Sequence, residues 1–150
     1  MLKILADENM PYVDELFGEF GQITRKAGRS MCASDLVDVD ILLVRSITQV
    51  DEALLHQATK LKFVGTATIG VDHIDKNYLA KRDINWTSAP GCNAIAVAEY
   101  VISALVHVCA KTKTKLSDKT VAIVGAGNIG TCLAKKLAAL GVSFFYCDPP

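Results

Sequence analysis

Short runs of consecutive apolar residues recur along the chain, separated by segments in which apolar residues return every three or four positions. The runs are typical of parallel strands buried on both faces, and the wider spacing is typical of helices with one buried face. Strands are therefore expected at residues 3–7, 40–46, 62–68, 84–87, 120–124 and 142–147. Helices are expected at residues 11–20, with Gly21 ending the first, and at 51–58, 74–81, 94–110 and 128–140.

This alternation of strands and helices predicts an α/β fold with a parallel sheet and right-handed crossovers. We expect a flavodoxin-like parallel-sheet substrate (catalytic) domain over residues 1–95. A connecting helix and linker are expected over residues 96–116, and residues 117–150 are expected to form the first βαβ unit of a Rossmann dinucleotide-binding domain. The predicted domain boundary lies near residues 111–118, where the composition turns polar after a long stretch that carries almost no charge.

Composition narrows the class of protein. The 150 residues carry 16 basic and 16 acidic side chains, so the net charge is zero, which argues against a nucleic-acid partner. The apolar fraction of 51% excludes intrinsic disorder. Five cysteines, an odd number without a C-x-x-C pair, do not suit a secreted disulfide framework, and the histidines and cysteines lack metal-site spacing. With an N-terminal apolar stretch too short for a signal peptide, we expect a cytoplasmic protein without a metal.

The predicted helix at residues 94–110 is apolar enough to be compared with a membrane span. It is shorter than the roughly 20 residues that a span needs, and it carries Glu99 and His107. A carboxylate in the middle of a bilayer is unfavourable. We therefore expect a buried core helix and no membrane partner, with Glu99 bonded to nearby backbone or lying near a cofactor.

The most specific motif is a glycine-rich turn between the strand at 120–124 and the next helix. Its three glycines, Gly125, Gly127 and Gly130, have the G-x-G-x-x-G spacing. In a dinucleotide site the first permits a tight turn, the second lets pyrophosphate approach the backbone, and the third lets helix and strand pack closely. The N–H groups of Asn128 and Ile129 would face the anion.

Asp148 completes the motif, because it ends the next strand 18 residues after Gly130. A carboxylate at about this spacing accepts hydrogen bonds from the ribose hydroxyls, and it would repel a 2′-phosphate. The motif therefore predicts NAD rather than NADP as cofactor. The alternative is a glycine-rich turn and a loop aspartate that bind nothing.

The segment after Thr120 supplies one strand, one helix and one further strand, whereas a dinucleotide-binding fold has two βαβαβ halves. A single unit would leave an apolar sheet edge without a partner. We therefore expect the chain to be the N-terminal part of a longer polypeptide.

Candidate substrate groups follow the strands of the first domain, because open α/β sheets bind ligands at the carboxyl ends of their strands. Hydroxyls, open backbone N–H groups and a guanidinium occur there, at Arg45 and Ser46, in residues 65–70 and in residues 89–93. Arg45 is open to two interpretations, as an anion ligand or as a solvated charge. Ser46 and Thr68 would by themselves be ordinary loop hydroxyls.

Several of these runs resemble the D-2-hydroxyacid dehydrogenase family. The resemblance is carried by residues 70–75 (GVDHID), 90–99 (PGCNAIAVAE) and 125–130 (GAGNIG), and by the runs at 4–12, 44–46, 64–68, 89–93 and 147–150. It implies an NAD-dependent homodimer that oxidises the 2-hydroxyl of a phosphorylated hydroxy acid. It also implies that Ser46 and Thr68 contact substrate and that the catalytic arginine, glutamate and histidine lie beyond residue 150.

Other functions stay open at this point. Within the family the substrate could be 3-phosphoglycerate or a plain 2-hydroxy acid, and outside catalysis the chain could be part of an NAD-binding regulatory module. A nucleophilic role for Cys92 is not expected, since no base accompanies it. His73, in a tight loop between Asp72 and Asp75, is more typical of a structural turn residue than of a ligand.

Overall fold

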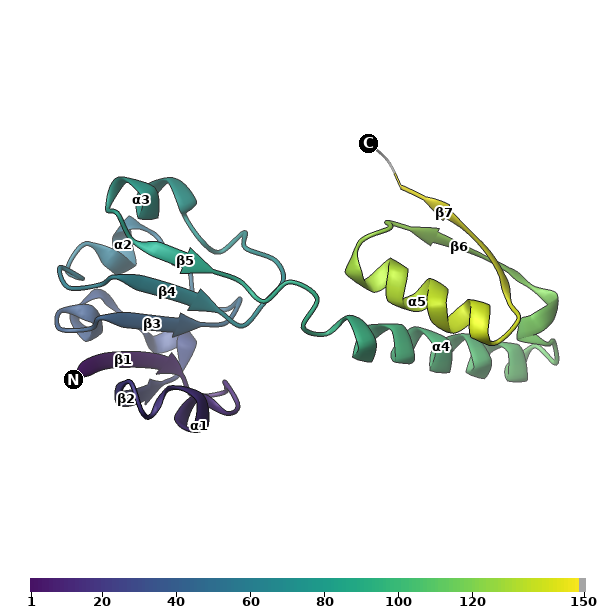
Figure 1. The fold of residues 1–150 in the computed structure, drawn as a ribbon, viewed down its shortest axis with the longest axis horizontal. Helices are drawn as coiled ribbons and strands as arrows, with labels where there is room; N and C mark the ends of the chain where they lie inside the picture. Colours follow the sequence, from purple (N-terminus) through teal and green to yellow (C-terminus); the bar gives the residue numbers. More distant parts are fainter. Residues whose placement is uncertain (149–150) are drawn as a thin grey trace. The chain divides into compact units, whose positions relative to one another are not determined.

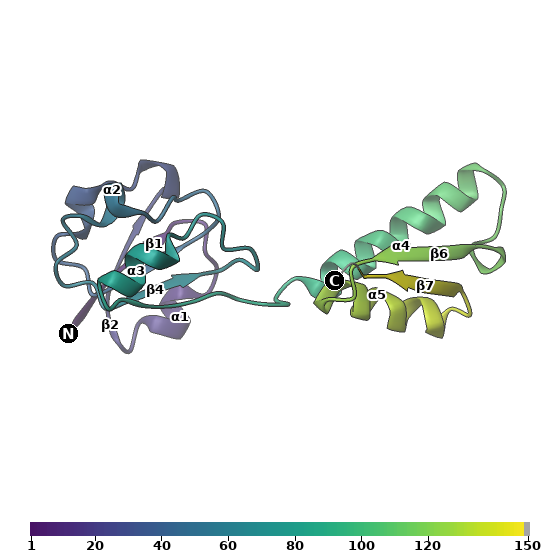
Figure 2. The ribbon, with the colours of Figure 1, turned by 90° about the horizontal axis from the view of Figure 1, so that it is seen from above.

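A computed structural model describes residues 1–148, and the chain divides into two compact units, Met1–Pro90 and Gly91–Pro150 (Figures 1 and 2). The prediction ended the first domain at residue 95 and treated residues 96–116 as a connection. The long helix in that stretch instead packs within the second unit, so the observed division comes earlier in the chain. Predictions for residues 149–150, which include the end of the last family run, lie outside the described residues.

The first unit is built on a sheet of parallel strands in the order β2-β1-β3-β4-β5. This is the flavodoxin-like order, as predicted. The strands are β1 (Leu2–Asp7), β2 (Gly21–Lys26), β3 (Ile41–Val44), β4 (Phe63–Thr66) and β5 (Asn85–Thr87). The predicted strands at 3–7, 40–46, 62–68 and 84–87 correspond to four of them.

Short helices cover both faces of this sheet. They are α1 (Val13–Phe17), η1 (Gly28–Ser30), η2 (Ala33–Leu36), α2 (Glu52–Leu55) and α3 (Lys76–Lys81). Leu5 and Leu42 pack on one face with apolar residues of η2, α2 and α3. Ile4 and Leu43 pack on the other face with Val13 of α1. The central strands are thus buried on both faces, which explains their uninterrupted apolar runs.

Strand β2 was missed, and the helix before it is shorter than predicted. Residues 11–20 were assigned to a helix that Gly21 ended, but α1 stops at Phe17 and Gly21 begins β2. The exposed edge strand carries polar side chains, so no apolar run marks it. Gly21 is needed there because a Cβ would lie 2.1 Å from the carbonyl oxygen of Leu2.

The second unit is a single βαβ unit preceded by a long helix. Its elements are α4 (Ala94–Lys111), η3 (Leu116–Asp118), β6 (Thr120–Val124), α5 (Asn128–Ala139) and β7 (Ser143–Cys147). Strands β6 and β7 pair in parallel from Thr120↔Ser143 to Val124↔Cys147. Ala98 of α4 packs with Ile123 of β6 and Leu137 of α5 in one apolar cluster. The order of elements matches the predicted start of a Rossmann domain.

Helix α4 is less buried than predicted. It is long and apolar enough to cross a membrane by length and composition alone, yet only 11% of its residues are buried. Ala94 and Ala98 are buried, whereas Ile95 and Tyr100 are 64% and 74% exposed. The expectation of a buried core helix is therefore wrong within residues 1–148, because α5 and the β6–β7 pair cover only one side of it.

Candidate functional site

The glycine-rich turn joins β6 to α5, and at two of its glycines a side chain would be strained or would clash. Gly125 has φ of +97°, a conformation that residues with a Cβ rarely adopt. A Cβ on Gly130 would lie 2.0 Å from the carbonyl oxygen of Gly125, so helix and turn touch through bare backbone. No heavy atom lies within 4 Å of a Cβ built on Gly127, which leaves open space beside the backbone there.

The same turn exposes hydrogen-bond donors at the start of α5. Gly127 is the N-cap residue of the helix and has no side chain that could accept a hydrogen bond. The N–H groups of Asn128 and Ile129, in the first turn, also have no acceptor within the helix. These N–H groups lie at the positive end of the helix dipole. Open space, free donors and favourable potential together suit a phosphate group.

Asp148 meets the turn from the end of β7. Its Oδ1 accepts a hydrogen bond of 3.0 Å from the backbone N–H of Ala126, between two of the glycines. The backbone N–H of Gly125 donates to the carbonyl oxygen of Cys147 at 2.9 Å, which ties the turn to the end of β7. Asp148 is exposed, and its Oδ2 makes no hydrogen bond within residues 1–148, so one carboxylate oxygen stays available. The geometry therefore fits a dinucleotide, with the diphosphate at the turn and a ribose at the carboxylate.

The candidate substrate residues lie at the carboxyl edge of the sheet in the first unit. Val44, the last residue of β3, pairs with Thr66, the last residue of β4. Ser46 and Thr68 each follow two residues later, so they leave neighbouring strands at the same edge. The backbone N–H of Ala89, after β5, donates to the carbonyl oxygen of Thr68 at 2.9 Å. The structure thus brings together three chain segments that the sequence had singled out separately.

The charge at this edge comes from Arg45, which directly follows β3. Its side chain is partly buried and makes no hydrogen bond or ion pair with any of residues 1–148. Ser46 beside it is exposed. An uncommitted guanidinium and a hydroxyl on adjacent residues can bind a phosphate or carboxylate.

The profile of one protein family, D-isomer specific 2-hydroxyacid dehydrogenase, catalytic domain, matches residues 2–142. The chain belongs to this dehydrogenase family. The predicted resemblance to this family is confirmed.

Named relatives make the likeness more specific. The erythronate-4-phosphate dehydrogenase of Tolumonas auensis is 56% identical over 148 residues, covering 99% of this chain and 40% of that protein. The protein of the same name from Pseudoalteromonas translucida is 55% identical with the same coverage. The chain therefore spans about two fifths of the length of these relatives.

Solved structures share the fold at lower identity. An NAD⁺-bound 3-phosphoglycerate dehydrogenase from Entamoeba histolytica superposes with a TM-score of 0.82 at 24% identity, covering 99% of this chain and 54% of that one. The TT0316 protein from Thermus thermophilus gives 0.81 at 20% identity, covering 99% and 57%. The predicted α/β fold class is thereby confirmed.

A buried network in this dehydrogenase chain was not predicted from the sequence. Oγ1 of Thr66 lies 2.7 Å from Oγ1 of Thr68 and 2.9 Å from Nε2 of His73. His73 is 7% exposed, and burial lowers its pKa, while the Asp72 carboxylate partly counteracts that shift. The structural interpretation of His73 is consistent with its buried hydrogen bond. A T-x-T pattern at a strand end was the only local signal for the network.

Asp7, the last residue of β1, is a second buried polar group that sequence reasoning missed. Its Oδ1 accepts from the N–H of Asn9 at 2.8 Å, whereas its Oδ2 has no partner in the part of the chain described. A Cβ on Gly28 would lie 2.4 Å from that Oδ2 and 2.6 Å from Oγ1 of Thr48. The carboxylate therefore rests against bare backbone near the point between β1 and β3 where flavodoxin-like sheets bind ligands.

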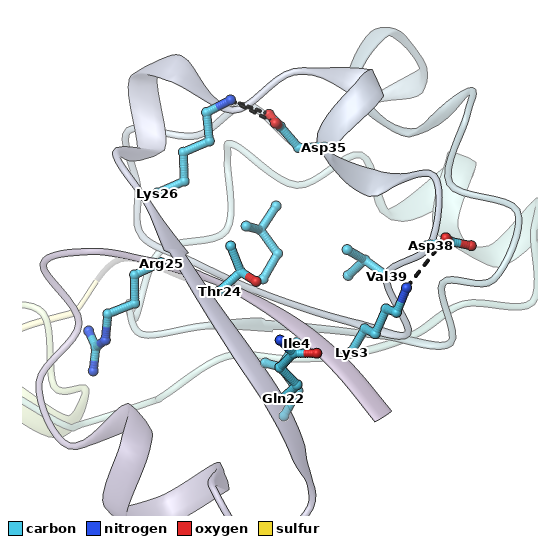
Figure 3. Close-up of a pocket in the computed structure, with 10 residues that line it drawn as sticks. Lys3, Ile4, Gln22, Thr24, Arg25, Lys26, Asp35, Asp38 and Val39 are labelled. Carbon is cyan, nitrogen blue, oxygen red and sulfur yellow. Dashed lines mark hydrogen bonds and ion pairs between the residues drawn. The ribbon is translucent and has the colours of Figure 1, made fainter. Parts of the chain in front are cut away.

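A hollow of about 370 Å³ over β1 and β2 is lined by several charged side chains (Figure 3). Two of the cations are paired there, Lys26 with Asp35 at 2.6 Å and Lys3 with Asp38 at 3.4 Å. The third cation, Arg25, is bonded to a carboxylate of α1. All three charges are thus neutralised within the unit, so the hollow has no free cation to hold an anionic substrate.

Two further predictions concern side chains outside these sites. Within residues 1–148 Glu99 is bonded to a side chain rather than to backbone, since its Oε1 accepts from Lys136 Nζ at 3.0 Å and ties α4 to α5. Cys92 is exposed just before α4. Across residues 1–148, no three His, Cys, Asp or Glu side chains gather closely enough to hold a metal ion.

Proposed function

We propose that the complete protein oxidises the 2-hydroxyl of 4-phospho-D-erythronate to 2-oxo-3-hydroxy-4-phosphobutanoate, with NAD as oxidant, in pyridoxal 5′-phosphate biosynthesis. The supporting observation is the identity of 51% to 56% with relatives that share one enzyme name. A cytoplasmic homodimer is part of this proposal.

NAD would be held by the second unit. The bare backbone at Gly125, Gly127 and Gly130 and the N–H groups of Asn128 and Ile129 would receive the diphosphate. Asp148 would accept hydrogen bonds from the adenosine ribose while remaining anchored to the turn. Bound NAD supplies the acceptor for the hydride that leaves the carbinol carbon.

The phosphorylated substrate would be held by Arg45, Ser46 and Thr68 at the edge of the first sheet. A guanidinium and a serine hydroxyl donate hydrogen bonds, as a phosphate or carboxylate requires. The base that takes the hydroxyl proton is expected beyond residue 150, so the residues described here bind and orient substrate. None of His56, His73 or His107 matches the family's base.

The direct test measures NADH absorbance with the complete protein. Rapid NAD reduction with 4-phospho-D-erythronate, and slow reduction with 3-phosphoglycerate or lactate, would support the proposal. Equal or faster reduction with 3-phosphoglycerate would assign a different substrate. Tight NAD binding without turnover on any hydroxy acid would instead indicate a regulatory module.

The cofactor preference is tested at Asp148. The Asp148→Asn variant keeps an oxygen that can accept from the N–H of Ala126 but loses the negative charge. We expect NAD to bind about tenfold more weakly, since a hydrogen bond to a charged group contributes about 1.5–3 kcal/mol. NADP binding should be unchanged or tighter, because the repulsion of its 2′-phosphate is removed. Equal weakening of both cofactors in a fluorescence titration would refute the role in ribose binding.

A further inference from the structure

Three short hydrogen bonds run in series through the loop that follows β4. Nε2 of His73 lies 2.9 Å from Oγ1 of Thr66, which lies 2.7 Å from Oγ1 of Thr68. Oγ1 of Thr68 lies 2.8 Å from the carbonyl oxygen of Gly70. Thr66 and His73 are 4% and 7% exposed, so solvent competes little for the first of these bonds.

The number of available protons allows only one direction for the series. A carbonyl oxygen cannot donate, so the Thr68 hydroxyl must give its proton to Gly70. The contact between the two threonines then requires the proton of Thr66. Thr66 has no second proton, so the contact with His73 requires a proton on Nε2 of the imidazole. Any other arrangement leaves two oxygen or nitrogen lone pairs facing each other at hydrogen-bond distance.

Backbone hydrogen bonds fix the chain segment that carries the imidazole. The carbonyl oxygen of His73 accepts from the N–H of Val50 at 2.8 Å, and the carbonyl oxygen of Val50 accepts from the N–H of Asp75 at 2.9 Å. Val50 is fully buried. The backbone that carries the ring is thus fastened to a second chain segment, and the ring itself is bonded to Thr66.

We infer that His73 is a positioning residue whose Nε2–H orients both threonine hydroxyls, so that Thr68 meets the substrate as a hydrogen-bond acceptor. The inference rests on the proposed function for the contact between Thr68 and substrate. With its own proton committed to Gly70 and one lone pair committed to Thr66, Thr68 has one lone pair left. That lone pair recognises a substrate hydroxyl. Phosphate and carboxylate oxygens need donors, which Arg45 and Ser46 offer instead.

The direction of the series is tested without any activity. In ¹⁵N NMR spectra of the complete protein at about pH 8, above the ordinary histidine pKa, neutral tautomers have distinct nitrogen shifts. We expect His73 to carry its proton on Nε2, with Nδ1 unprotonated. His56 supplies a reference for the opposite tautomer, because its Nδ1 lies 2.9 Å from the carbonyl oxygen of Ala53, which cannot donate. An unprotonated Nε2 at His73 would overturn the inference, whether or not the proposed substrate is correct.

The positioning role is tested by two matched pairs of variants in the complete enzyme. Thr66→Val removes the donor to Thr68 and His73→Leu removes the donor to Thr66. Each should raise KM for 4-phospho-D-erythronate roughly tenfold, as expected when a buried partner is lost, with a smaller change in kcat. Thr66→Ser and His73→Gln, whose amide can donate from near the position of Nε2, should restore KM to within about twofold.

The control is His56→Leu, at an exposed position in the first unit, which should leave both constants unchanged. Wild-type KM in Thr66→Val, or a failure of His73→Gln to restore KM in a folded variant, would refute the positioning role. Absence of turnover in the wild type would refute the proposed function alone, because the NMR result stands by itself.

Discussion

The contact between Gly130 and Gly125 makes a sharp prediction about stability. A Cβ on Gly130 would lie 2.0 Å from the carbonyl oxygen of Gly125, and real Cβ contacts essentially never fall below 3.0 Å. Gly130→Ala therefore forces α5 away from β6 by about 1 Å, the difference of these two distances. Overpacking of this kind typically destabilises a protein by about 1–3 kcal/mol.

The helix position partly offsets that loss. Alanine is favoured over glycine within a helix by up to about 1 kcal/mol, and Gly130 lies in the first turn of α5. We therefore expect a net loss of about 1–2 kcal/mol in the free energy of opening of the second unit. Hydrogen exchange of the α5 amides measures that free energy, and protection should fall about tenfold for each 1.4 kcal/mol.

Gly127→Ser is the matched control at the same turn. The backbone angles of Gly127, φ −71° and ψ −164°, suit any residue, the added Cβ meets open space, and serine caps helices well. We expect exchange within about 0.5 kcal/mol of wild type, but weaker NAD binding because the side chain occupies the space proposed for the diphosphate. Wild-type exchange in Gly130→Ala, or equal destabilisation by the two variants, would refute the reasoning.

Two further predictions concern the first unit. Arg82 donates to the carbonyl oxygens of Leu55 and Ala58 at 3.2 and 2.9 Å, so Arg82→Met should lower the free energy of unfolding by about 1–3 kcal/mol in urea titrations, and a neutral result would contradict this bonding role. Because burial lowers the pKa of His73, its contribution to stability is complete above the unfolded pKa of about 6.5 and is lost as pH falls from there toward the lower folded pKa. The free energy of unfolding should thus fall as the pH drops below about 6.5 in the wild type and fall less steeply in His73→Gln, and equal slopes would show that His73 does not cause the fall.

The sequence by itself determined the class of fold and the candidate cofactor turn. Uninterrupted apolar runs such as the one in β3 predict strands buried on both faces, and this depends only on the local pattern. The glycine motif is equally local, because the tight turn and the close approach at Gly130 are demands on neighbouring backbone. The distance in sequence to Asp148 was also informative, since a βα unit has a characteristic length.

The pairing of strand β2 and the exposure of helix α4 were decided only by the tertiary structure. Strand β2 is held by backbone hydrogen bonds to β1. Its side chains are mostly polar, so no hydrophobic pattern in the sequence predicts this pairing. The exposure of α4 depends on how much of its surface α5 and the β6–β7 pair cover, which no pattern within the helix records.

At the edge of the first sheet, too, the sequence predicts the polar residues but not their hydrogen-bond partners. The sequence singles out Thr68 as a hydroxyl that follows a strand. The direction of its hydrogen bonds, however, depends on Thr66 and His73, which only the fold places beside it. Likewise, an acid at the end of β1 is visible in the sequence, whereas the burial of Asp7 against Gly28 is not. Local sequence patterns predict which residues become buried. The hydrogen-bond partners of buried polar groups can be distant in sequence, so they are determined only by the tertiary fold.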